Sequence, residues 1–335
     1  MPHRPLFFFA FCFFCLACFL FPTAVVFAVH MGQDHFEKEL SNNQNEILAK
    51  SSSAKSNNSF NQNEILVKTS SAKSNNSFMV RIPEGAFKMG SSFKENKKHL
   101  KECRKYDKSC ELWWFSDEFP DNLISLDSFW IDTYEVTNEK YLEFVLATGH
   151  RLALDETCET GKCREGNLWK GASFSPRIKN QPVTQVSWDD ANAYCRWRGK
   201  RLPSEAEWEK TARGPSGNLY PWGSGSPKNR ATYGRKWRGV FTMTDVGAYS
   251  SGASLYGVFD MAGNVWEWVD DWYDLKYYNW RRKKTPRGPL EGEFKVVRGG
   301  SWVNYPDTLR SSFRRWSEPE VRYNDTGFRC ASDDN

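Results

Sequence analysis

Three segments of the chain place apolar side chains at helical spacing between a polar capping residue and a glycine. Apolar residues three and four positions apart share one face of a helix, a serine or threonine caps its free amides, and a glycine ends it. In two of the segments an acidic residue three positions after the serine completes a capping box. We therefore predict helices between Thr137 and Gly149, between Ser187 and Gly199, and between Ser204 and Gly214.

Shorter apolar stretches predict strands. Residues 80–83, 87–90 and 129–134 carry strand-like patterns, the second ending in a glycine turn. From residue 215 onward Gly, Pro, Asn and Asp recur every few positions, so we expect little regular structure there. The aromatic residues within 214–257 indicate that these loops are packed.

The start of the chain has the pattern of an export signal. After Arg4 an uncharged, Phe-rich stretch covers residues 6–29, and small residues near Ala28 suit cleavage. We predict that residues 1–28 are a signal peptide and that the chain is secreted or periplasmic/extracytoplasmic. Two membrane-anchored alternatives stay open: an uncleaved signal, since the stretch is long enough to span a bilayer, and a lipid on Cys18.

A near-perfect duplication follows the signal. Residues 43–60 recur almost unchanged as residues 61–78, and both copies are rich in Ser, Asn and Lys. Two such copies are too few and too polar to share a buried face, so we predict a flexible low-complexity spacer over residues 29–78. The folded domain is then expected over residues 79–335.

Six of the nine cysteines lie beyond the signal, and an even number in an exported chain indicates disulfides. Two pairs flank short polar loops, which favours local bonds and leaves the last two cysteines to each other. The predicted pairs are Cys103 with Cys110, Cys158 with Cys163, and Cys195 with Cys330. Zinc is the rival interpretation, but these cysteines form no CxxC motif.

Charge and aromatic content narrow the classes of partner. The net charge of +5 is small for 335 residues and the cations are scattered, so nucleic acid is not expected as a partner. The basic run at residues 281–284 fits a solvated loop better than an anion site. All 15 Trp lie between Trp113 and Trp316, which predicts a core of packed rings.

A series of strings resembles a known family in order and spacing. They are RLPSEAEWE at 201–209, YPWG at 220–223, DMAGNVWEW at 260–268, RGGSW at 298–302 and GFRC at 327–330. They resemble the formylglycine-generating enzyme (sulfatase-modifying factor) family over nearly all of residues 79–332. The resemblance implies an α+β, C-type-lectin-like fold with short strands, few helices and much irregular structure. It also implies the Cys195–Cys330 disulfide.

The resemblance further implies a structural calcium site at Asp260, Gly263, Val265 and Glu267. Calcium prefers carboxylate and main-chain carbonyl oxygens on a tightly turning loop, which this segment supplies. The alternative is a buried loop in which Asp260 caps amides and Glu267 pairs with an arginine. A second family site near residues 231–233 is not predicted, because Thr232 stands where relatives have an asparagine.

The family's oxygen-using members bind copper(I) through two cysteines after the RGGSW string and oxidise a substrate cysteine. Here Asn304 and Leu309 occupy those positions, and neither an amide nor an alkyl group replaces a thiolate for copper(I). Copper is therefore not expected as a cofactor, and we do not expect this chain to convert cysteine to formylglycine.

Two functions remain. The first is a non-catalytic binding or structural module for an unknown protein, peptide or glycan ligand, tethered through its N-terminus if that segment stays in a membrane. The second is a redirected oxidoreductase, since some relatives without the cysteine pair mature exported peptides or siderophores. In that second case the groove would be floored by the candidates Ser301, Trp302, Asn304 and Arg314.

Overall fold

The computed structural model describes residues 78–154 and 167–334. Its α-helices are α2 (Phe93–Cys103), α3 (Asn138–Thr148), α4 (Trp188–Trp197), α5 (Glu205–Arg213) and α6 (Tyr277–Trp280). Its 3-10 helices are η1 (Leu112–Glu118), η3 (Pro176–Ile178), η4 (Gly239–Phe241), η5 (Ser250–Gly252) and η6 (Pro306–Thr308). Its strands are β1 (Met79–Ile82), β2 (Gly85–Met89), β3 (Asn122–Leu126), β4 (Phe129–Asp132), β5 (Trp266–Trp272), β6 (Lys295–Arg298), β7 (Arg315–Ser317), β8 (Thr326–Phe328) and β9 (Ala331–Asp333).

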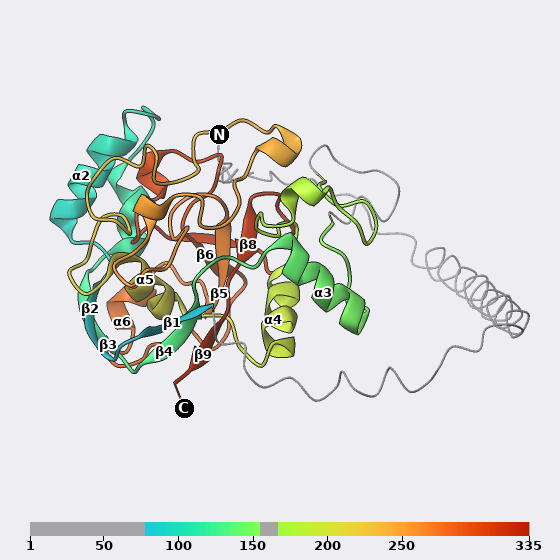
Figure 1. Cartoon of the computed structure of the whole chain (residues 1–335). Coiled ribbons are helices and arrows are strands. Elements are labelled where there is room, and N and C mark those ends of the chain that lie inside the picture. The colour runs from blue at the N-terminus through green and yellow to red at the C-terminus, as the bar shows by residue number, and fades with distance from the viewer. Residues whose placement is uncertain (1–77, 155–166, 335) are drawn as a thin grey trace, which may run out of the picture. The chain divides into compact units, whose positions relative to one another are not determined.

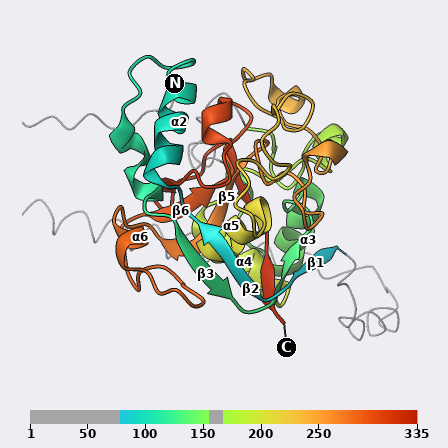
Figure 2. The ribbon, with the colours of Figure 1, turned by 90° about the vertical axis from the view of Figure 1, so that its left-hand side faces the viewer.

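The strands form three small sheets. Their orders are β1-β4-β9, β2-β3 and β7-β6-β5-β8, and all pairings are antiparallel except that of β5 with β8. The last strand, β9, pairs with β4, so the C-terminal end of the chain joins the first sheet of the domain. Figure 1 shows α3 and α4 together on one side of the sheets and α2 on the other, and Figure 2 shows β2 and β3 from the face nearest the viewer.

The predicted helix caps are confirmed. The side chain of Thr137 accepts a hydrogen bond from the Lys140 amide at the start of α3. Ser187 and Ser204 each form a complete capping box, with the acidic side chain three residues on accepting from the serine amide. Caps satisfy amides that the helix itself leaves without acceptors, which is why these serines mark the starts.

Large aromatic side chains lie packed in the interior, as predicted. Trp208, Trp266 and Trp268 are each at most 1% exposed. Residues from α3, α4, β5 and β8 make one apolar cluster, and residues from β1 to β4, α5 and β6 make a second. Little regular structure was expected from residue 215 onward. Up to residue 265 the regular elements are the 3-10 turns η4 and η5, but beyond it the chain forms β5 to β9, α6 and η6, so the prediction is confirmed only for the segment before β5.

The pattern analysis missed α2 and η1. Helix α2 is polar along most of its length, and its buried residues are Asn96, His99 and Cys103. The chain enters it through Gly90, whose φ is +87° and whose added Cβ would lie 2.6 Å from the Glu118 carbonyl oxygen. That close approach brings the end of η1 against the turn before α2.

Two predicted disulfides are present. Cys103 bonds to Cys110 and Cys195 bonds to Cys330, with Cα atoms 6.2 Å and 5.6 Å apart. The predicted pair Cys158–Cys163, the signal and all of the spacer up to residue 77 lie outside the described residues. In the part of the chain that is described, no helix is both long and apolar enough to span a bilayer.

Candidate functional site

The segment that follows β6 contains three of the four groove candidates. Ser301 is fully buried, and its amide donates to Asn304 Oδ1 over 2.9 Å. The Ser301 hydroxyl lies 2.7 Å from the same oxygen and 3.1 Å from Asp325 Oδ2. Asn304 is 6% exposed, and its main-chain oxygen accepts from the Gly234 amide over 2.8 Å. The Asn304 side chain therefore holds a turn together.

Leu309, at the second family cysteine position, is fully buried. It packs in an apolar cluster with Tyr220, Ala231 and Ala262. A Cβ added at Gly300 would lie 2.6 Å from Leu309 Cδ2, so the backbone closes tightly over this side chain. The position is filled by hydrocarbon packing, and no polar group of Leu309 is available for chemistry.

Thiols are likewise committed in the part of the chain that is described. Its four cysteines form the Cys103–Cys110 and Cys195–Cys330 bonds. A disulfide sulfur is not a thiolate, and copper(I) sites in proteins use thiolate or thioether ligands. Asn304, Leu309 and the four described cysteines thus offer no pair of thiolates for copper(I) within the described residues.

The other two candidates point away from solvent. Trp302 is 5% exposed, its indole nitrogen lies 3.4 Å from the Asn324 carbonyl oxygen, and its ring contacts Trp237. Arg314 is buried in a two-point ion pair with Glu205, at 2.7 Å and 3.0 Å. Arg314 therefore belongs to a buried ionic network and does not line the surface beside Asn304.

A hollow of about 500 Å³ opens beside the Asn304 turn. Main-chain hydrogen bonds from Gly234 to Asn304 and from Arg235 to Trp302 fix its position. Four tyrosines and two cationic side chains line it. Two of the tyrosines, Tyr106 and Tyr305, stack face to face with ring centres 5.1 Å apart. Its lining side chains include Tyr106, Tyr233, Tyr249, Tyr305, Lys228 and Arg235.

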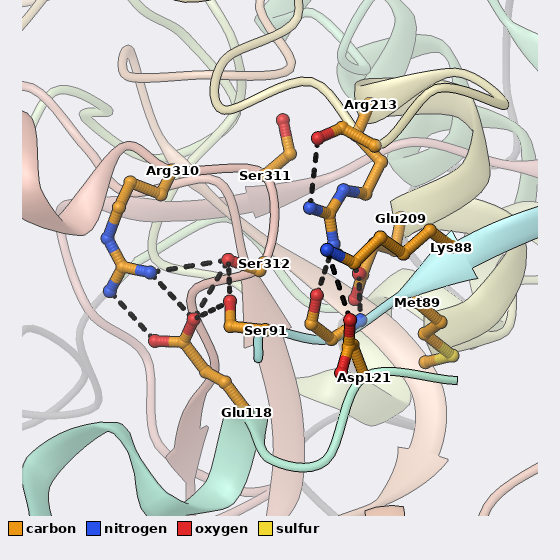
Figure 3. Close-up of polar contacts among 12 residues, drawn as sticks. Lys88, Met89, Ser91, Glu118, Asp121, Glu209, Arg213, Arg310, Ser311 and Ser312 are labelled. Atoms are coloured by element: carbon orange, nitrogen blue, oxygen red, sulfur yellow. Dashed lines mark hydrogen bonds and ion pairs between the residues drawn. The ribbon is translucent and has the colours of Figure 1, made fainter. Parts of the chain in front are cut away.

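A buried ion pair holds the α2–η1 hairpin, and with it Tyr106, against the segment between β6 and β7. We call this segment, residues 299–314, the site loop. The Arg310 guanidinium donates to both Glu118 oxygens over 2.6 Å and 2.8 Å, and Ser312 donates to Glu118 over 2.8 Å (Figure 3). Burial alone would raise the pKa of Glu118, but the adjacent Arg310 charge lowers that pKa to about 2. Glu118 is therefore ionised, and the pair ties the hairpin to the residue after Leu309.

The predicted calcium segment is a tight loop. Asp260 and Gly263 have φ of 57° and 80°, and a Cβ on Gly263 would lie 2.4 Å from the Thr232 carbonyl oxygen, so only glycine fits. Asp260 Oδ2 accepts from the Gly247 amide over 2.6 Å. Arg329 donates to both oxygens of Glu267 over 2.7 Å. Both contacts of the calcium-free alternative are thus present.

A third carboxylate, which sequence reasoning missed, lies beside this loop. Glu135 is 1% exposed; its Oε2 accepts from Asn264 Nδ2 over 2.8 Å, while its Oε1 has no partner among the described residues. Burial, and then the charges of Asp260 and Glu267, raise the pKa of Glu135 well above its ordinary value. Burial also raises the pKa of Asp260 to about 6.

The carboxylates beside this loop supply oxygen donors and negative charge of the kind that calcium prefers. Among the described residues Arg329 is the cation that acts on Glu135, Asp260 and Glu267, which leaves an excess of two negative charges when all three carboxylates are ionised. Within the described residues no three Asp, Glu, His or Cys side chains group closely enough to hold an ion alone. Main-chain carbonyls, such as those of Gly263 and Val265, would therefore have to supply part of the coordination.

Most of this chain is similar in sequence to one known protein family. The family described as "Sulfatase-modifying factor enzyme 1-like domain" matches residues 65–334. The formylglycine-generating enzyme of Mus musculus is 31% identical over 297 residues, which cover 76% of this chain and 75% of that protein. The "Inactive C-alpha-formylglycine-generating enzyme 2" of Bos taurus is 30% identical over 299 residues, covering 76% and 87%.

A solved structure agrees with these matches. The structure of PvdO from Pseudomonas aeruginosa superimposes with a TM-score of 0.58 at 27% identity, covering 76% of this chain and 94% of that one. The fold, the order of the sequence strings and the family match therefore point to the same relatives.

Proposed function

The chain belongs to the sulfatase-modifying factor family, and from that premise we propose that it is an exported, calcium-stabilised binding module that does not convert cysteine to formylglycine. The observation that carries this proposal is the state of positions 304 and 309. The Asn304 side chain accepts hydrogen bonds within a buried turn, and the Leu309 side chain packs in an apolar cluster. The inactive bovine relative is a precedent within the family for the loss of that activity.

A binding role is supported by the surface that adjoins Asn304. The hollow is rimmed by exposed rings, with Tyr106 43% and Tyr305 52% accessible. Tyrosine supplies a large contact area at small entropic cost, which is why it is enriched in recognition surfaces. A redirected oxidoreductase, supported by the likeness to PvdO, would instead need a reacting group in an enclosed pocket at this place.

Oxygen consumption tests the catalytic part of the proposal. The purified chain is supplied with copper and a cysteine-containing peptide, and dissolved oxygen and peptide mass are followed. We expect no oxygen uptake above the buffer rate and no aldehyde in the peptide. Asn304→Cys/Leu309→Cys serves as a matched variant that restores both thiols on the same scaffold. Turnover by the unaltered chain would overturn the proposal.

Calcium is proposed to stabilise the loop that carries Asp260, Gly263, Val265 and Glu267. The unpaired oxygen of Glu135 and the excess negative charge support this. A bound ion stabilises the folded state by RT ln(1 + [L]/Kd), which is about 2.7 kcal/mol at one hundred times Kd. Thermal unfolding in excess calcium and in EDTA measures that shift, and equal midpoints in both would refute the calcium proposal.

Export is proposed from the apolar start of the chain and the two disulfides. Disulfides persist in oxidising compartments. The N-terminal mass of protein recovered from an expressing cell decides between the outcomes. Cleavage near Ala28 supports export of a soluble mature form, retained N-terminal residues or a lipid mass on Cys18 supports an anchor, and a full-length cytosolic protein contradicts export.

A further inference from the structure

All charged side chains are cationic in the segment that forms much of the tyrosine-lined hollow. Residues 223–244 contain five Lys or Arg and no Asp or Glu. Two of these cations, Lys228 and Arg235, line the hollow itself. The charge of the hollow is therefore much more one-sided than the net charge of the chain.

Both lining cations are free to meet a ligand anion. None of the ion pairs formed among the described residues involves Lys228 or Arg235. Arg235 is nevertheless held in place, since it donates to the Thr242 carbonyl oxygen over 2.7 Å and to the Tyr249 hydroxyl over 3.3 Å. A fixed guanidinium loses less entropy when it binds a carboxylate than a mobile one does.

Acidic groups close to the tyrosine rim do not cancel this charge. Glu102, which acts electrostatically on Tyr106, is paired with Lys105 over 2.6 Å. Asp307, a second neighbouring acid, is 8% exposed, and Asp107, next to Tyr106, already accepts hydrogen bonds from the amide and hydroxyl of Ser109. An incoming anion therefore meets Lys228 and Arg235 rather than a carboxylate.

The rim is pre-organised by contacts far from the hollow. Tyr106 lies in the loop closed by the Cys103–Cys110 bond and stacks on Tyr305 with an interplanar angle of 9°. The Glu118–Arg310 pair fixes that hairpin to the site loop. Stacked rings that do not have to be ordered on binding are typical anchors of protein-recognition surfaces.

We propose that this hollow binds an acidic peptide segment of a protein partner, with Lys228 and Arg235 meeting its carboxylates and the tyrosines packing its apolar atoms. This inference rests on the proposed function as a binding module and names the partner of that site. Tyrosine and arginine without carboxylates make the composition that protein interfaces favour. A polyanion such as nucleic acid or a sulfated glycan requires a longer track of cations than two lining residues provide.

Selection from a random peptide library displayed on phage tests the proposal on the whole purified chain. We expect enrichment of peptides that contain several Asp or Glu together with apolar residues. Affinity of an enriched synthetic peptide is then measured by fluorescence anisotropy. It should fall at least about tenfold in Lys228→Glu/Arg235→Glu, and should weaken as salt rises, because exposed charges are screened.

The matched control is Lys236→Glu/Arg238→Glu, which makes the same charge change in the same segment on side chains that do not line the hollow. It should keep affinity within about threefold. Because Arg235 also supports the loop, Lys228→Glu alone serves as a second variant, at an exposed side chain. Thermal midpoints confirm that each variant is folded.

Several results would overturn the inference: enrichment of neutral or basic peptides, no enrichment over an uncoated surface, or equal loss in both double variants. Tighter binding of a heparin-derived oligosaccharide than of any selected peptide, lost in both double variants, would point to a polyanion instead. These failures differ from failure of the proposed function. Oxygen turnover would refute the proposal that the chain is non-catalytic, whichever peptides are enriched. Binding of neutral peptides at the hollow would refute the acidic partner but not the binding function.

Discussion

Removal of the Glu118 charge is the most informative perturbation of the site's support. Glu118→Gln keeps the shape of the side chain but leaves the Arg310 guanidinium, 1% exposed, without its counter-charge. Glu118 now accepts two charged hydrogen bonds from Arg310, at 2.6 Å and 2.8 Å, and one each from the hydroxyls of Ser312, at 2.8 Å, and Ser91, at 3.1 Å. Breaking one side of a buried pair costs about 3–5 kcal/mol, because the remaining ion has lost its water without compensation.

Chemical denaturation measures this cost as the change in unfolding free energy. A loss of about 3–5 kcal/mol is a large part of the roughly 5–15 kcal/mol that stabilises a typical domain, so the variant should unfold at much lower denaturant concentration. Glu102→Gln is the control, since Glu102 pairs with Lys105 on the surface, with side chains 37% and 59% exposed. That exposed pair should contribute less than about 1 kcal/mol.

The same pair predicts a pH dependence with a definite sign. Arg310 holds the pKa of folded Glu118 at about 2, below the ordinary unfolded value of about 4. The stabilisation is therefore complete above the unfolded pKa and is lost as the pH falls toward about 2. The difference between the unaltered chain and Glu118→Gln should shrink on acidification through that window. A difference no larger than that of the control, or one that is independent of pH, would refute the reasoning.

Three further perturbations address the proposed calcium loop, the α2–η1 hairpin and the apolar side chain at position 309. Glu135→Gln should abolish the calcium-dependent rise in thermal midpoint, whereas Glu139→Gln, at a side chain 54% exposed, should keep it; an unchanged calcium response in Glu135→Gln would remove Glu135 from the site. Cys103→Ser with Cys110→Ser should lower the unfolding free energy by about 2–3 kcal/mol, from a short closed loop, as measured in denaturant, and no change would mean that the bond adds no constraint. Leu309→Ala should cost about 2–5 kcal/mol through the cavity it leaves, and a cost below about 1 kcal/mol would show that the position is not packed as described.

Local signals in the sequence predicted the local structure well. The capping boxes at Ser187 and Ser204 fixed the starts of α4 and α5 because cap, acidic partner and apolar face lie within one helical turn or two. The same signal was present before α2, where Ser92 and Glu95 form a complete box. It was missed because the buried residues of α2 are mostly polar, so no apolar run follows the cap.

Long-range contacts explain what the sequence did not disclose. Glu135 meets its partner Asn264 across 129 positions, and Tyr106 stacks on Tyr305 across nearly two hundred. No periodicity or spacing links such residues, since the fold alone brings them together. Arg314 shows the converse: its place in the chain suggested the groove, but its pairing with Glu205 buries it.

The central claim is that this scaffold has no copper(I) site because an amide and an alkyl side chain stand where two thiols would be needed. Competition for copper(I) against a coloured chelator, on purified chain with its disulfides intact, measures this directly. The account predicts that the chelator keeps its copper at every protein concentration and that the Asn304→Cys/Leu309→Cys variant withdraws it. Withdrawal of one equivalent by the unaltered chain, abolished by thiol alkylation, would contradict the claim.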